Sequence, residues 1–236
     1  MCIRDSLTVV AAGVVIGFPV FSSLSMQSLP ASHGGVVLGI LPLATAAVSR
    51  IVSDERPSIG FWLIAGVGSV LVVSYSLFQG GGTFPAGDLS LFAATISAAF
   101  GYAVGGKLSK QLGGWQVICW ALVISLPFTL IPALAFTPSD LHSLNWSVVL
   151  SFAYLALISQ LVGFFIWYKA MAIGGVARVS QVQLLQPFIT LIASAWLLFE
   201  TVEYHTYLFA VAIVVLVTIG KRMPIYSKHQ PNQHSG

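Results

Sequence analysis

Charged side chains are scarce in this sequence. Asp, Glu, Lys and Arg make up 7% of the 236 residues, while hydrophobic residues make up 57%. The mean hydropathy is +0.91. A soluble domain carries about 25% charged residues. This shortage excludes an ordinary soluble protein and predicts an integral membrane protein that is surrounded by the lipid bilayer.

The residues and motifs that build metal, redox, nucleic-acid and catalytic sites are also few. The two cysteines, Cys2 and Cys119, give neither a disulfide framework nor a metal-binding spacing. The net charge is +3, but the ten Lys and Arg are scattered and form no basic stripe. We therefore expect no nucleic-acid partner. No P-loop, HExxH motif or pair of membrane carboxylates is present, so we expect no catalytic residue, metal or cofactor.

Long apolar runs are what the sequence does contain. A spanning helix needs about 20 predominantly apolar residues, and turn-like Gly, Pro and Asn residues separate the runs. The polar tail at 223–236 is predicted to be disordered, and the first six residues are interpreted as a junction that precedes the first helix. The fold class is thus an all-α polytopic membrane protein with eight transmembrane helices, at 7–28, 32–53, 58–78, 89–109, 114–136, 146–169, 176–199 and 204–222.

Basic residues alternate between the connections of these helices. Lys and Arg accumulate in cytoplasmic loops of membrane proteins. Every second connection contains or adjoins them, and the intervening connections have none. We therefore predict that both chain ends, including the C-terminus, are cytoplasmic. The residues that set this orientation are Arg50, Arg56, Lys107, Lys110, Lys169, Arg178, Lys221 and Arg222.

The two parts of the chain repeat each other at an offset of 145 positions, which relates Pro42 to Pro187 and Glu55 to Glu200. The first three helices then correspond to the last three. Five helix starts separate the copies, so the second copy is inverted, as in many secondary transporters. We expect one domain at 7–78 and a second at 89–222. On this count the first copy lacks two helices, and we expect the sequence to be a fragment of a ten-helix protein. Alternatively, the protein belongs to a family that has an eight-helix member.

The repeated motif carries a family resemblance. LPLATAAVSRIVSDE is followed by GFWLIAGVGSVLVV, and QPFITLIASAWLLFE is followed by YLFAVAIVVLVTIG. This pair resembles the EamA repeat of the drug/metabolite transporter superfamily, over nearly everything from Leu7 to Lys221. The resemblance implies ten helices in two inverted five-helix halves. It also implies export of metabolites, amino acids or drugs across the bacterial inner membrane.

The repeated prolines are candidate hinges. Pro42 and Pro187 each remove a backbone hydrogen bond within a predicted helix, although proline is also commoner in membrane helices generally. Glu55 and Glu200 fall at helix ends. For them a structural role, capping a turn or pairing with a group such as Arg56, is favoured over proton coupling.

The candidate solute-binding residues are polar or aromatic side chains within spanning segments. A buried amide needs partners for its donors and its acceptor, and the alternative for each is an interhelical hydrogen bond. Ser180, Gln183, Pro187, Thr190 and Ser194 follow one helical face, and Thr45 lies on the equivalent stripe. The candidates are Gln183, Gln160, Gln186, Thr190, Ser180, Trp167, Tyr102 and Thr45, with Gln160 and Trp167 sharing a face.

The leading functional hypothesis is secondary transport by alternating access. A neutral or zwitterionic small molecule would bind near mid-membrane between the halves, which would rock about the proline-bearing helices. A passive channel or a non-transporting membrane subunit is the alternative, and an intramembrane enzyme is poorly supported. Small-xxx-small patterns, such as Gly13 with Gly17 and Gly101 with Gly105, predict close helix packing, either within the chain or in a homodimer.

Overall fold

The computed structural model describes residues 2–27, 38–53, 55–80, 87–135, 145–186, 188–189, 196 and 204–227. Over these ranges the chain is helical apart from its turns and two short strands. Helices long and apolar enough to cross a membrane are Ile3–Met26, Leu89–Leu112, Gly114–Ala135, Trp146–Gly174 and Tyr204–Arg222, and two shorter apolar helices accompany them. The prediction of an all-α membrane protein is confirmed.

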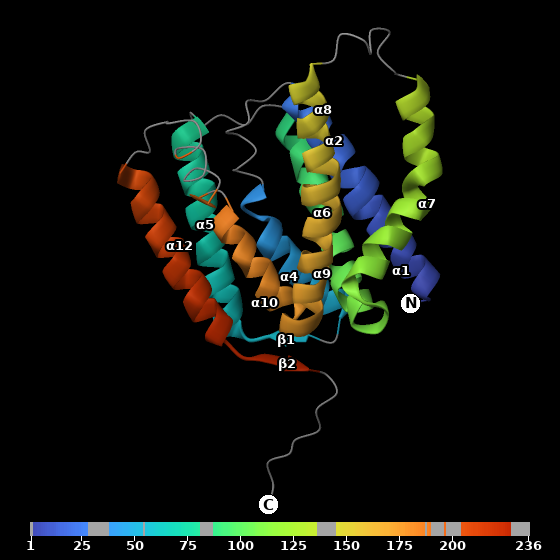
Figure 1. Ribbon diagram of the computed structural model, residues 1–236. Coiled ribbons are helices and arrows are strands. Elements are labelled where there is room, and N and C mark those ends of the chain that lie inside the picture. The colour runs from blue at the N-terminus through green and yellow to red at the C-terminus, as the bar shows by residue number, and fades with distance from the viewer. Residues whose placement is uncertain are drawn as a thin grey trace, which may run out of the picture.

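The first part of the chain contains three membrane segments (Figure 1). The first is one continuous helix made of α1 (Ile3–Val10), the π-helical η1 (Ala11–Gly17) and α2 (Phe18–Met26). The second contains α4 (Leu41–Val52), which follows a turn at Gly39 and Ile40. The strand β1 (Glu55–Pro57) then leads into α5 (Ile59–Gly80).

The second part begins with two long helices, α6 (Gly87–Leu112) and α7 (Gly114–Ala135). Another continuous helix follows, made of α8 (Trp146–Ala153), the π-helical η3 (Tyr154–Val162) and α9 (Gly163–Gly174). The short helix α10 (Val176–Ser180) passes into the 3₁₀ segment η4 (Gln181–Leu185). The chain ends in α12 (Tyr204–Arg222) and β2 (Ile225–Ser227).

Helix α6 lies at the centre and contacts α1, η1, α2, α4, α7 and α9. Glycines let its neighbours approach. A Cβ on Gly13 would meet the backbone of Ser97, and a Cβ on Gly101 would meet Val14. A Cβ on Gly105 would likewise overlap the Tyr168 ring. These small-residue patterns are therefore used for packing within the chain.

Several predicted boundaries are wrong. The first helix begins at Ile3 rather than at residue 7, because Arg4 and Asp5 are tolerated at an exposed helix end, where an acidic first turn is favourable. The sixth helix runs to Gly174 rather than to residue 169. The predicted helix 32–53 is interrupted at the turn before Leu41, next to Pro42. The helices at 114–136 and 204–222 agree with α7 and α12 to within one residue.

The prediction of a disordered tail from residue 223 is wrong for Ile225–Ser227. This segment forms β2, which pairs antiparallel with β1 and places Arg56 opposite Tyr226. The pairing joins residues that are far apart in the sequence, so local composition gives no sign of it. The tail beyond residue 227 lies outside the described residues.

The connections that carry basic residues lie at one end of the molecule. Figure 1 shows β1, β2 and the turns before α7 and α10 together at the lower end, next to the start of α1. An ion pair between Lys110 and Glu55 joins two of these connections. The structure thus reproduces the predicted alternation, and we call this end the basic face.

Candidate functional site

The crossing of α4 with α10 and η4 brings polar groups to the centre of the chain. Pro42 lies in the first turn of α4. The prediction that it removes a hydrogen bond within a helix is wrong, because the first N–H groups of a helix have no partner inside it. Its carbonyl oxygen accepts from Ser180 Oγ at 3.3 Å and from Gln181 Nε2 at 3.5 Å. Ser180 Oγ also donates to the Ala177 carbonyl at 2.9 Å. Ser180 and Gln181 are almost completely buried. The two proline-bearing segments are therefore joined by side-chain hydrogen bonds.

Tyr102 of α6 contacts two other predicted site residues, Trp167 and Gln183. Its ring lies edge-on to the ring of Trp167, with centroids 5.9 Å apart, and 6.0 Å from the ring of Phe164. Its hydroxyl interacts with the side chain of Gln183 in η4. Tyr102 packs in the same core as Leu41, which lies one helical turn before Thr45 on the same face of α4. Residues from α6, α9 and η4 thus meet at one aromatic centre, and α4 packs against α6 and η4.

Three buried polar atoms in these elements have no hydrogen-bond partner among the described residues. They are Thr45 Oγ1, Trp167 Nε1 and Gln183 Oε1. Leaving a buried donor or acceptor unpaired costs about 1–3 kcal/mol, so native structures rarely do so without a reason. A hydroxyl, an indole N–H donor and an amide acceptor are the groups that a polar solute would satisfy.

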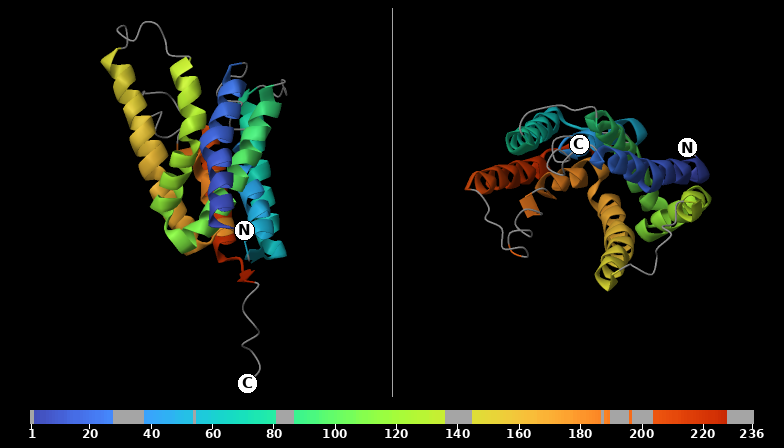
Figure 2. Two further views of the ribbon diagram at one scale, coloured as in Figure 1. Left: turned by 90° about the vertical axis from the view of Figure 1, so that its right-hand side faces the viewer. Right: turned by 90° about the horizontal axis from the view of Figure 1, so that it is seen from above.

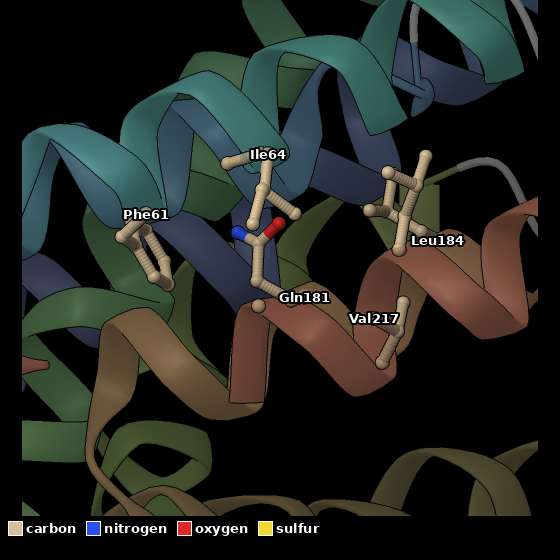
Figure 3. A pocket seen from close by; sticks show the side chains of 8 residues that line it. Phe61, Ile64, Gln181, Leu184 and Val217 are labelled. Carbon is tan, nitrogen blue, oxygen red and sulfur yellow. The ribbon is translucent and has the colours of Figure 1, made fainter. Parts of the chain in front are cut away.

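A narrow apolar crevice lies beside this region, between α5, η4 and α12 (Figure 3). Its empty volume is about 210 Å³, which includes space open to solvent. Figure 3 shows Gln181 extending from η4 toward Ile64 of α5. Gln181 was not among the predicted site residues. It meets the same criterion as the other glutamines, because it carries an amide within a predicted spanning helix. The crevice is lined by Phe61, Ile64, Ala65, Gln181, Leu184, Leu216, Val217 and Gly220.

Two other predicted site residues have exposed side chains. Gln160 and Gln186 are exposed. The α-helical spacing that placed Gln160 on the face of Trp167 does not hold, because Gln160 lies in the π-helical η3, whose hydrogen bonds span five residues. Pro187, Thr190 and Ser194 fall outside the described residues.

Glu55 has the structural role that the sequence favoured. Its carboxylate accepts from the backbone N–H groups of Val176 and Ala177, at 2.9 Å each, and so caps the start of α10. Its charged partner is Lys110, at 3.7 Å, rather than the predicted Arg56. Within the described ranges, no cluster of His, Cys, Asp or Glu is arranged to hold a metal ion.

The comparison with known families decides the identity of the fold. Residues 85–219 match the model of the EamA-like transporter family. The chain belongs to this family. It is therefore a membrane transporter of the drug/metabolite type and an integral membrane protein that crosses the bilayer several times, and its partner is a small-molecule solute.

Relatives of this EamA-like transporter are also named as transporters. The uncharacterized transporter YdeK of Bacillus subtilis is 44% identical over 217 residues, which cover 92% of this chain and 76% of YdeK. A probable amino-acid metabolite efflux pump of Salmonella typhimurium is 28% identical over 208 residues, covering 80% of this chain and 68% of the pump. No solved structure matches the chain.

Proposed function

We propose that this EamA-like protein is a secondary transporter that exports a small metabolite or drug-like solute by alternating access. The observation that carries the proposal is the set of unpaired buried atoms. Trp167 Nε1 and Gln183 Oε1 belong to residues beside Tyr102, and Thr45 Oγ1 lies on α4, which packs against α6 and η4. A solute that hydrogen-bonds to these atoms would satisfy them.

The chemistry of these residues favours a neutral or zwitterionic solute with an apolar part. Tyr102, Trp167 and Phe164 offer aromatic surface, while the amide and hydroxyl groups can bond polar atoms. No Asp, Glu, Lys, Arg or His belongs to this set. A multiply charged ion at mid-membrane would lack a countercharge here. The Salmonella relative, which is named for amino-acid metabolites, leads us to test neutral amino acids first.

The repeat supports the transport mechanism. The offset of 145 positions between the two copies relates η1 to residues 156–162. These residues lie inside the other π-helical segment, η3. The turn at Gly39 and Ile40 corresponds in the same way to the end of the 3₁₀ segment η4. Interrupted helices at repeat-related positions are typical of inverted-repeat transporters. We therefore propose the ten-helix, five-plus-five EamA architecture, in which the halves rock about the segments that contain Pro42 and Pro187.

The orientation and the oligomeric state complete the proposal. The basic face carries Arg56, Lys110, Arg178 and Lys221, so by the positive-inside rule it faces the cytoplasm, and the C-terminus lies there. A homodimer is not part of the proposal, because the small-residue patterns at Gly13 and in α6 are filled by contacts within the chain.

Counterflow in proteoliposomes tests the proposed function. The purified protein, with both proposed five-helix halves complete, is reconstituted with an unlabelled neutral amino acid trapped inside, and uptake of the labelled form is followed against empty liposomes. A carrier accelerates labelled uptake when solute is trapped inside. A passive channel gives equal uptake with and without trapped solute, and a non-transporting subunit gives none across a panel of amino acids and uncharged metabolites. Either of these results would contradict the proposal.

A further inference from the structure

The basic face is closed by a contact between distant parts of the chain. Glu55 follows α4, whereas Val176 and Ala177 begin α10, more than a hundred residues later. Both carboxylate oxygens of Glu55 are used, since Oε1 accepts from Val176 N–H and Oε2 from Ala177 N–H. Glu55 is only 9% exposed. One side chain therefore ties the end of α4 to the start of α10.

Gly175 makes this contact possible. Its φ of 84° lies in the left-handed region that favours glycine, and it turns the chain from α9 into α10. A Cβ at this position would stand 3.1 Å from Glu55 Oε1. The turn presents the first N–H groups of α10, which have no partner inside the helix, directly to the carboxylate.

Further contacts surround the Glu55 carboxylate at the same face. Lys110 of α6 lies 3.7 Å from Oε1. Arg178 Nη2 donates to the Met223 carbonyl at 3.3 Å, and β1, which contains Glu55, pairs with β2 after α12. The carboxylate thus sits where α4, α6, α10 and the end of α12 converge.

The two ends of the molecule are packed very differently. Near the basic face, Ser49, Val176 and Ala177 are fully buried. Toward the opposite end, residues 126–135 of α7 and residues 146–152 of α8 are all exposed. Figures 1 and 2 show these two helices diverging away from β1 and β2. Among the described residues, the basic face is the closed end.

We propose that Glu55 is the latch of the basic face, and that a solute passes this face only when the carboxylate leaves the N–H groups of Val176 and Ala177. The inference rests on the proposed transport function and adds the position of a gate. The contact suits a gate because both partners, the carboxylate and the backbone N–H groups, are polar. Water can hydrogen-bond the freed carboxylate and the freed N–H groups, so opening exchanges hydrogen bonds rather than losing them.

The test measures access from the basic face. Cys2→Ser and Cys119→Ser remove the native thiols, and Ser49→Cys places a reporter in buried α4, just inside the closed face. A membrane-impermeant maleimide is added to vesicles whose basic face points outward. Glu55→Gln replaces one acceptor oxygen by an NH₂ group that cannot accept from an N–H. Gly175→Ala disturbs the same contact from the other side and leaves the carboxylate in place.

Both variants should label about ten times faster than the parent. Glu55→Gln loses one of the two hydrogen bonds and the negative charge that strengthens the other, and the methyl group of Gly175→Ala crowds Oε1 of Glu55. Asp5→Asn controls for loss of an exposed carboxylate. Gly66→Ala controls for a new methyl group, since nothing lies within 4 Å of its added Cβ. Both controls should label at the parent rate. If Glu55→Gln does not accumulate in the membrane, Gly175→Ala decides alone.

Labelling within twofold of the parent in Glu55→Gln and Gly175→Ala would overturn the latch. This readout needs no solute, so its failure is distinct from failure of the proposed function. If the two variants label faster but the parent shows no counterflow, the result supports the role of Glu55 and contradicts the transport function. If the parent shows counterflow but the two variants label at the parent rate, the result supports the transport function and contradicts the role of Glu55.

Discussion

Replacing Gln183 by leucine separates solute binding from folding. The change removes Oε1, which has no partner among the described residues, and the side-chain interaction with Tyr102. Relief of an unpaired buried acceptor is worth about 1–3 kcal/mol, while an interhelical hydrogen bond in a membrane is worth about 0.6–2 kcal/mol. These effects oppose each other. We therefore expect the abundance and thermal stability of Gln183→Leu to stay close to the parent values.

Solute affinity should respond differently. A solute group that bonds the Gln183 amide would be left unpaired in the variant, at a cost of about 1–3 kcal/mol. Since 1.4 kcal/mol is tenfold in affinity, the apparent affinity should fall roughly 5- to 150-fold. The assay is competition of unlabelled solute against labelled uptake in counterflow, run beside a thermal melt of the same preparation.

Gln186→Leu is the matched control. It makes the same chemical change three residues later, at an exposed position, and should leave affinity within about twofold of the parent because no site contact is lost. Equal losses of affinity in both variants would refute the assignment of Gln183. Loss of folded protein in Gln183→Leu alone would show that the amide is a packing contact.

The other predictions concern the site, the packing and the orientation. Trp167→Phe keeps an aromatic ring beside Tyr102 but removes the unpaired Nε1–H, so solute affinity should fall about tenfold with little change in melting temperature; an unchanged affinity would remove Trp167 from the site. Gly101→Ala forces a methyl group into η1 and should destabilise the protein by about 1–3 kcal/mol in a thermal melt, whereas Gly66→Ala should be neutral; equal melting temperatures would contradict the packing. A reporter fused after Lys221 should be cytoplasmic and one inserted at position 81 external, and the opposite pair of signals would reverse the orientation.

Composition and periodicity predicted much of the fold. The bounds of α12 follow from its apolar run between Tyr204 and Arg222, and the basic residues predicted which connections share a face. The π-helical turns in η1 and η3 could not be predicted, because their apolar residues suit an ordinary α-helix equally well. The pairing of β1 with β2 escaped prediction for a related reason, since it depends on contacts between segments that are far apart in sequence.

The role of the candidate site residues stays a prediction. Gln183, Tyr102 and Trp167 were chosen as polar or aromatic side chains in spanning segments, and the structure places Gln183 and Trp167 beside Tyr102. Gln181 was missed because it lies one residue off the stripe that starts at Ser180, yet its side chain reaches the same Pro42 carbonyl as Ser180. The cap that Glu55 provides was expected, but its partners in α10 could be found only from the tertiary structure.

Protection of a cysteine at position 183 tests most directly whether the residues around Tyr102 form the solute site. In a background without Cys2 and Cys119, Gln183→Cys should react with a water-soluble thiol reagent, and the solute that drives counterflow should slow the reaction. Phe188→Cys should stay unreactive, because Phe188 is 2% exposed and packs against Tyr75. Equal labelling at both positions, or labelling at position 183 that the solute does not slow, would contradict the account.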